Sequence, residues 1–154
     1  MGKETKKKYE ELADKYKLPS FDSLNKDFEI STIEETEFLL REIRRKIIEK
    51  LENYIKLLEG ILHPEAGICD MYECGAFSDE EKNKLFELYK KIMFLNRFSA
   101  ETSIDEDDSK SSNFIKKAFE QLNNIKKELL PMIKRMKEGW LEEKKVKTEL
   151  GYLG

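Results

Sequence analysis

Residues 31–62, STIEETEFLLREIRRKIIEKLENYIKLLEGIL, decide the fold, because they carry the longest regular hydrophobic pattern in the chain. Apolar residues recur there at intervals of three and four, the spacing that places side chains on one side of an α-helix. These positions are Ile33, Leu40, Ile43, Ile47, Leu51, Tyr54, Leu58 and Ile61, with a second stripe of Leu39, Ile48, Ile55 and Leu62 beside them. So wide an apolar face predicts a helix that is buried against more than one neighbour.

The start of this helix is predicted at Ser31, because Glu34 follows three residues later and the two side chains have the spacing of a capping box. Neither proline nor glycine interrupts the stretch before Gly60. On the polar side, acidic residues precede basic ones by four positions, which is the favourable order for charge pairs on a solvated helix face. The sequence therefore predicts one helix over residues 31–62.

A second long helix is predicted over residues 78–98, SDEEKNKLFELYKKIMFLNRF. Ser78 and Glu81 repeat the capping-box spacing at its start. The positions expected to face inward are Leu85, Leu88, Tyr89, Ile92, Met93 and Leu95. They recur at helical spacing, so this segment is also expected to bury one face against its neighbours.

A third long helix is predicted over residues 113–141, with Ser112 as its N-cap. Its apolar positions step by three and four residues and are Ile115, Ala118, Leu122, Ile125, Leu129, Met132, Met136 and Trp140. Pro131 lies within this pattern. Because the proline ring removes one backbone hydrogen bond and crowds the preceding turn, we expect a kink there or a break into two helices.

Two shorter helices are predicted ahead of the long ones, over residues 3–17 and after Ser20, which is a suitable N-cap. Their apolar positions are Tyr9, Leu12, Ala13 and Tyr16 in the first, and Phe21, Leu24 and Phe28 in the second. The predicted fold is therefore all-α, a helical bundle of three long antiparallel helices plus a short N-terminal helical pair. Residues 1–150 are expected to form a single helical-bundle domain, and residues 141–154 a C-terminal tail that is flexible or docks.

The connections between the long helices are predicted to be long. Residues 100–112, AETSIDEDDSKSS, contain five acidic residues and four serines, which is typical of a flexible and solvated loop. Residues 63–75, HPEAGICDMYECG, begin where a histidine before a proline ends the first long helix. A single helical turn is expected within this second loop, and the side chains expected to pack on the bundle from it are Ile68, Met71 and Tyr72.

The segment 63–75 also contains the only histidine and both cysteines of the chain, His63, Cys69 and Cys74. Zinc accepts these ligand types. However, four residues separate the two cysteines and no second compact ligand pair follows, which is a poor spacing for a zinc site. No metal or cofactor is therefore predicted, and the two cysteines are left as free thiols, a disulfide or metal ligands.

Composition excludes several classes of protein. The chain has 29 basic and 32 acidic residues, so its net charge is only −3 and no strong field attracts nucleic acid or an anionic membrane. No apolar run is long enough to span a membrane, and the first residues lack the apolar core of a signal peptide. With one histidine and no glycine-rich phosphate loop, no catalytic residue is predicted. We expect a cytoplasmic protein that is not an enzyme.

Binding to another protein is the predicted function, as an adaptor or accessory subunit. Phe94 and Phe98 lie on a different side of their helix from the leucine and isoleucine stripe, so they are expected to be exposed. Exposed aromatic side chains are typical of contact sites. Tyr152 and Leu153 in the tail sequence GYLG are the other residues expected to contact a partner, which can also be a second copy of the chain.

The alternative prediction is a protein that binds nucleic acid or associates with the ribosome through basic helix faces. Basic residues cluster on the first and third long helices, and acidic neighbours neutralise much of the first cluster. The candidate residues are Arg41, Arg44, Arg45, Lys126, Lys127, Lys134 and Arg135.

The segments LPSFDSLNKDFEISTIEETEFLLREIRRKIIEKLENYIKLLEGIL and MYECGAFSDEEKNKLFELYKKIMFLNR together resemble small, uncharacterised all-helical proteins of archaea. The resemblance covers most of the chain and implies a helical fold. It carries no activity, so it implies no functional residue.

Overall fold

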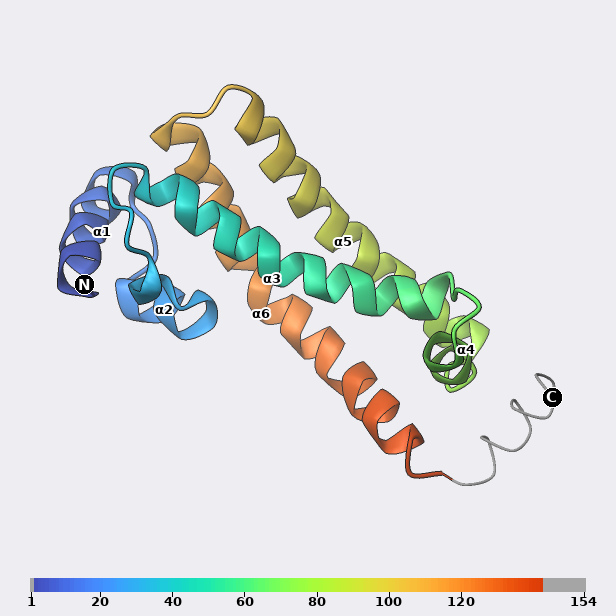
Figure 1. Ribbon diagram of the computed structural model, residues 1–154. Helices are drawn as coiled ribbons and strands as arrows, with labels where there is room; N and C mark the ends of the chain where they lie inside the picture. Colours follow the sequence, from blue (N-terminus) through green and yellow to red (C-terminus); the bar gives the residue numbers. More distant parts are fainter. Residues whose placement is uncertain (1, 143–154) are drawn as a thin grey trace. The chain divides into compact units, whose positions relative to one another are not determined.

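The computed structural model describes residues 2–142. Within that range the chain forms six α-helices, one short 3-10 helix and no strand, which confirms the predicted all-α class (Figure 1). The elements are α1 (Gly2–Tyr16), α2 (Phe21–Phe28), η1 (Ile30–Thr32), α3 (Leu39–Leu62), α4 (Ile68–Cys74), α5 (Asp79–Ile104) and α6 (Asp108–Gly139).

The chain divides into two compact units, and α3, α5 and α6 each contribute residues to both. The first unit comprises Met1–Asn53 and Met93–Asn123, and the second comprises Tyr54–Ile92 and Asn124–Gly154. The N-terminal helical pair thus belongs to the first unit and α4 to the second. The antiparallel arrangement of the long helices and a single domain over residues 1–150 stay predictions.

In the first unit, α1, α2 and η1 lie beside the first part of α3 (Figure 1). Thr5 Oγ1 donates a hydrogen bond to the carbonyl of Ile33 at 2.7 Å, and Lys116 Nζ donates to the carbonyl of Tyr16 at 3.0 Å. Both ends of α1 are therefore held to the rest of the unit. The fully buried side chains of the first unit include Tyr9, Leu24, Ile30, Leu40, Ile43, Ile47, Phe114 and Ile115.

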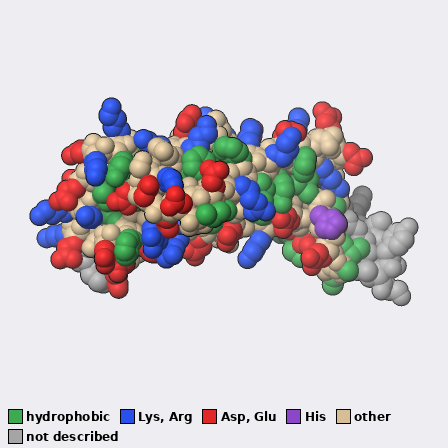
Figure 2. Space-filling model, turned by 90° about the horizontal axis from the view of Figure 1, so that it is seen from above, with side chains coloured by type: hydrophobic (Ala, Val, Ile, Leu, Met, Phe, Trp, Pro, Cys, Tyr) green, Lys and Arg blue, Asp and Glu red, His purple; other side chains and the backbone are tan. Residues whose placement is uncertain are grey.

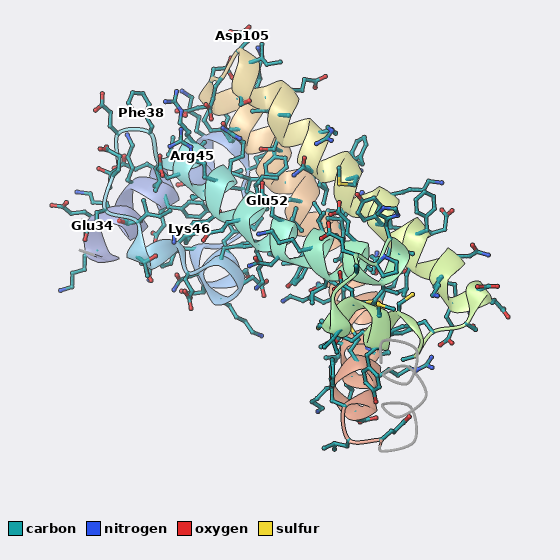
Figure 3. The ribbon with its side chains drawn as sticks, turned by 45° about the vertical axis from the view of Figure 1, so that its right-hand side comes forward. Glu34, Phe38, Arg45, Lys46, Glu52 and Asp105 are labelled. Carbon is teal, nitrogen blue, oxygen red and sulfur yellow. The ribbon has the colours of Figure 1, made fainter. Side chains whose placement is uncertain are left out.

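α3 begins at Leu39, so the helix start and capping box predicted at Ser31 are wrong. α2 ends at Phe28, its C-cap Glu29 has a left-handed φ of 52°, and η1 follows in place of a first α-helical turn. The Ser31 N–H donates to Asn25 Oδ1 at 2.8 Å. Glu34, the expected capping partner, is exposed in the non-helical stretch before α3 (Figure 3). Bonds to neighbouring elements here override a local signal.

The connection between α5 and α6 is much shorter than predicted. α5 continues to Ile104 and α6 begins at Asp108, so the flexible loop expected over residues 100–112 is wrong. Asp107 acts as the N-cap of α6, because its carboxylate accepts a backbone N–H of the first turn at 2.8 Å. Ser112, the predicted cap, is buried inside the helix.

An ion cluster holds this connection to α3. The side chain of Arg44 is buried, and its guanidinium donates to Glu106 Oε1 at 2.8 and 3.2 Å and to Ser99 Oγ at 2.6 Å. Arg41 Nε lies 2.9 Å from Glu106 Oε2. A buried charge is stable only beside an opposite charge, so Arg44 confines Glu106 to this position.

α6 runs without a break through Pro131, so the break that was one of the two expected outcomes does not occur. The proline itself is exposed, whereas Leu129, Met132 and Met136 on the same turns are buried. Loss of one backbone bond at an interior proline costs about 3 kcal/mol. Burial of the flanking apolar side chains offsets this cost and keeps the residues helical.

In the second unit, the capping box predicted at the start of α5 is confirmed. The Ser78 N–H donates to Glu81 Oε1 at 3.0 Å, and the Glu81 N–H donates to Ser78 Oγ at 3.2 Å. The helix then buries Leu85 and Leu88, as its apolar spacing predicts. Both capping bonds are local, and Arg135 of α6 pairs with the other carboxylate oxygen of Glu81 without displacing them.

α4 is a seven-residue helix, longer than the single turn expected in this segment. Tyr72 is buried as predicted, with its ring centroid 4.4 Å from that of Trp140. Ile68 is 59% exposed and Met71 is 36% exposed, so the predicted packing of these two side chains is wrong. Ile68 is the first residue of α4, one turn before Tyr72, and the contact with Trp140 is made at the Tyr72 turn.

Replacement of Glu106 by alanine should destabilise the protein strongly. The change leaves Arg44 buried without its carboxylate, and breaking a mostly buried pair costs about 2–4 kcal/mol. Urea unfolding followed by circular dichroism measures the free energy of unfolding. Asp105→Ala is the matched control, because that side chain is 90% exposed and its loss should change stability little. Equal effects of the two substitutions would show that the cluster does not stabilise the fold.

The two serines that precede Glu at capping-box spacing should respond differently to alanine. Ser78→Ala removes a hydroxyl that accepts a backbone N–H and should cost about 1 kcal/mol. Ser31→Ala should be nearly neutral, because Ser31 uses only its backbone N–H in the bond to Asn25. Unfolding midpoints of the two variants, compared at equal m-values, test this contrast, and a larger loss for Ser31→Ala would contradict it.

Candidate functional site

Three aromatic rings in the first unit form a chain from the core to the surface. Phe114 of α6 is fully buried, and its ring centroid lies 5.7 Å from that of Phe98 on α5. Phe98 is half-buried and contacts Phe94 edge to face, with centroids 6.2 Å apart and an angle of 88° between the rings. Phe94 is 54% exposed. The structure thus places both predicted aromatic residues in one cluster, with the outer ring held by the inner ones.

A cavity of about 400 Å³ opens beside Phe98, in the hairpin formed by α5 and α6. Its lining residues are Phe98, Glu101, Thr102, Asp105, Lys110 and Asn113. Thr102 is buried and Phe98 half-buried, whereas the charged residues are exposed at the rim. We name Phe94, Phe98 and this cavity the aromatic site. An apolar base with a charged rim suits an apolar side chain of a partner flanked by polar groups.

One ion pair borders the cavity. Lys110 Nζ donates to Asp105 Oδ2 and to the Asp105 carbonyl, both at 2.9 Å, and Figure 3 labels Asp105 at the end of α5. The hydrogen bond from Lys110, with the positive charge that it carries, holds the pKa of the Asp105 carboxyl below its usual range. Asp105 is therefore ionised throughout the neutral range, and the rim presents both signs of charge.

The sequence singled out the two phenylalanines but not the cavity, and Phe98, expected to be exposed, is half-buried because its ring packs on Phe114. Phe94 and Phe98 differ from the buried stripe of their helix, which is visible in the sequence alone. The cavity depends on the early start of α6, and residues 100–112 have the composition of a loop. The other predicted contact residues, Tyr152 and Leu153, lie outside the described residues.

The three arginines of α3 that are candidates for nucleic-acid binding each have an acidic partner. Arg44 and Arg41 contact Glu106, and the Arg41 guanidinium also lies 4.6 Å from the ring centroid of Phe38. Arg45 Nη1 lies 2.8 Å from Glu42 on the same helix. Figure 3 labels Phe38 and Arg45 at the start of α3. Only Arg45 of the three is well exposed.

The remaining basic candidates belong to α6 in the second unit. Arg135 forms an ion pair with Glu81, donates to the Ala76 carbonyl, and lies 5.0 Å from the ring centroid of Phe77. Lys127 and Lys134 are exposed, and Lys126 is partly buried. Figure 2 shows lysine and arginine mixed with aspartate and glutamate over the face that it draws.

A larger groove of about 770 Å³ lies within the second unit and was not predicted. It is lined by Lys56, Glu59, Gly60, Leu62, His63, Glu65, Asp70, Lys82, Asn83, Phe86 and Tyr89. Gly60 allows α3 and α4 to approach, since a Cβ there would come within 2.9 Å of Asp70 Oδ1. Tyr89 donates to Glu59 at 2.7 Å across the floor of the groove. Its charges are mixed, so the groove favours no single class of ligand.

The reactive residues of segment 63–75 do not assemble into a metal centre. Within residues 2–142, no group of three or more His, Cys, Asp and Glu side chains is placed to hold an ion. Cys69 and Cys74 are not joined by a disulfide bond in this structure. Burial and the neighbouring Glu73 carboxylate raise the pKa of the Cys69 thiol, so it is a poor nucleophile. No helix among the described residues is long and apolar enough to cross a membrane.

Removal of the ammonium group at position 110 should raise the pKa of Asp105. Because the folded-state pKa of this carboxyl is depressed, the pair stabilises the hairpin at neutral pH, and this contribution is lost as the pH falls through the folded pKa. NMR titration of the carboxyl carbon in Lys110→Met should show a pKa near the ordinary aspartate value, with Lys84→Met as an unaffected control. An unchanged Asp105 pKa in Lys110→Met would contradict the assigned contact.

Comparison with known proteins found no matching family model, no similar curated protein and no similar solved structure. The aromatic site combines an exposed ring, an anchor in the core and an adjacent cavity.

Proposed function

We propose that this protein binds another protein through the aromatic site and acts as a non-catalytic adaptor or accessory subunit. The observation that carries the proposal is the exposed Phe94 ring, fixed by Phe98, which is itself packed on the buried Phe114. An aromatic side chain with both polar and apolar neighbours is the usual centre of a protein interface. The proposal assumes the antiparallel arrangement of α3, α5 and α6 predicted from the sequence.

The fixed orientation of Phe94 favours binding of a partner, because it lowers the conformational entropy that the side chain loses on binding. A freely rotating side chain loses about 0.5–1.5 kcal/mol of conformational freedom when a partner immobilises it. The edge contact with Phe98 already restricts the ring in the free protein. Burial of the remaining exposed area of the ring then contributes roughly 1–2 kcal/mol, which is about a tenfold change in affinity.

The surroundings of Phe94 also fit a protein partner. Arg97 is exposed one turn further along α5, and its guanidinium donates to Asn96 Oδ1 at 2.7 Å. Arginine and aromatic residues are the types most enriched at the energetic centres of interfaces. The cavity beside Phe98 offers a recess for one apolar side chain of the partner.

The alternative, binding of nucleic acid, receives less support. Arg44 is buried, and Arg41 and Arg44 share one carboxylate, so this pair has little charge left for a phosphate. Arg135 is likewise engaged by Glu81. Arg45 is exposed but pairs with Glu42. The other exposed candidates are Lys127 and Lys134, and two lysines neutralise too few phosphates for strong binding at physiological salt.

Substitution of Phe94 should abolish capture of the partner. The full chain, immobilised through an added tag, is incubated with extract, and bound proteins are quantified for the native chain, Phe94→Asp and Phe86→Asp. Phe86 is the matched control, because it is a phenylalanine of the same helix and is 49% exposed. We expect a specific protein that the native chain and Phe86→Asp retain and that Phe94→Asp loses by about tenfold or more.

Two results would overturn the proposal. One is equal recovery of every captured protein by Phe94→Asp and the native chain. The other is capture that disappears on nuclease treatment, falls steeply with salt and is lost in Lys127→Glu combined with Lys134→Glu, which would favour nucleic-acid binding.

A further inference from the structure

The second unit exposes an apolar surface where the described part of α6 meets α4. Ile68 and Met71 lie three residues apart on one side of α4, and are 59% and 36% exposed. Trp140 and Leu141, just after α6, are 44% and 84% exposed. We name these four residues the α4 surface. Exposed apolar side chains gathered on two touching elements are typical of a docking face.

Contacts between Trp140 and α4 hold the two parts of this surface together. The Trp140 ring packs against that of Tyr72 with centroids 4.4 Å apart and a tilt of 37°, and its Nε1 donates to Glu73 Oε2 at 3.0 Å. The Tyr72 hydroxyl also donates to the Gly139 carbonyl. The end of α6 is thus fixed on α4, and Ile68 and Met71 remain uncovered among the described residues.

The sequence around α4 is strongly acidic. Residues 64–81 contain six carboxylates and neither lysine nor arginine. The acidic residues are Glu65, Asp70, Glu73, Asp79, Glu80 and Glu81. Glu81 is paired with Arg135, and the first three belong to α4 or the loop before it. A segment that covers the α4 surface should therefore combine apolar with basic side chains.

The chain supplies such a segment directly after the described residues. The Glu142 carbonyl lies 3.3 Å from the Tyr72 hydroxyl, so the described chain ends beside α4. Residues 143–154, EKKVKTELGYLG, contain three lysines, at 144, 145 and 147, and two glutamates, at 143 and 149, so basic side chains exceed acidic ones by one. Their apolar residues are Val146, Leu150, Tyr152 and Leu153.

We propose that residues 143–154 dock on the α4 surface of the same chain and cover Ile68 and Met71. Twelve residues reach up to about 40 Å when extended, whereas a seven-residue helix is about 10 Å long, so the segment spans the surface easily. Because it is tethered at Glu142, its effective concentration at α4 is of the order of millimolar. Weak apolar contacts and weak attraction between opposite charges are therefore enough to keep the surface covered. A basic segment of another protein would have to compete with residues 143–154 for this surface.

Limited proteolysis of the full chain tests the docking. Trypsin cleaves after Lys144, Lys145 and Lys147, and cleavage is slowed in proportion to the docked fraction. Ile68→Asp combined with Met71→Asp introduces two acidic groups on exposed positions and removes the apolar contacts. We expect this variant to lose the segment at least about fivefold faster than the native chain. Ile104→Asp is the control, because Ile104 is 86% exposed in the first unit, and its rate should match the native rate.

Fluorescence of Trp140 provides a second test of docking on the α4 surface. Trp140 is the only tryptophan, so its fluorescence reports on the α4 surface. In the full chain, Val146→Asp with Leu150→Asp should increase quenching of Trp140 by acrylamide about twofold or more. Circular dichroism melting curves confirm that each variant is folded.

Three outcomes would overturn the proposal. They are equal trypsin rates in the native chain and the α4 variant, a rate that rises equally in Ile104→Asp, and protection that disappears on dilution. The last result would assign the contact to a second copy of the chain instead. None of these outcomes bears on Phe94, so the test is independent of the proposed function.

Discussion

The burial of Arg44 is the constraint on which the first unit depends. A guanidinium that is 6% exposed must be paired, because an isolated charge in the interior costs several kcal/mol. Glu106 supplies the partner, and Ser99 accepts a further hydrogen bond at 2.6 Å. Both lie at the α5–α6 hairpin, so one side chain of α3 determines where that hairpin closes. The closure in turn places Asp105 and Lys110 at the rim of the aromatic site.

The helical character of the chain was predictable, because spacing at three and four residues is a local property. The boundaries were predictable only where local signals act alone. Ser78 and Glu81 cap α5 as expected. Ser31 and Glu34 have the same spacing, yet Asn25 accepts the Ser31 N–H and Thr5 donates to the carbonyl of Ile33. Asn25 belongs to the preceding helix and Thr5 lies 28 residues before Ile33, so capping statistics, which consider only the first turn of a helix, could not anticipate these bonds.

The aromatic site also has one part that the sequence indicates and one part that it does not. The exposure of Phe94 follows from its position on the helix, which sequence shows. The cavity beside Phe98 does not, because composition alone assigns residues 105–108 to a solvated loop. In the structure Glu106 is largely buried between two arginines, whereas Asp105 is 90% exposed. Neighbouring acidic residues thus have opposite environments, and only the tertiary pairing with Arg44 distinguishes them.

The distribution of paired charges also explains why the aromatic site is the better candidate for recognition. A charged side chain contributes to binding only to the extent that its present partners release it. Arg41, Arg44 and Arg135 each contact a carboxylate within the fold, so recruitment of these groups by a phosphate would first break a stabilising contact. Phe94 has no such competing use, because its outer face contacts only solvent in the described structure and its inner edge is already held by Phe98. Among the described residues Arg41, Arg44, Arg45 and Arg135 each pair with a carboxylate, so the proposed function takes its recognition energy from exposed apolar side chains.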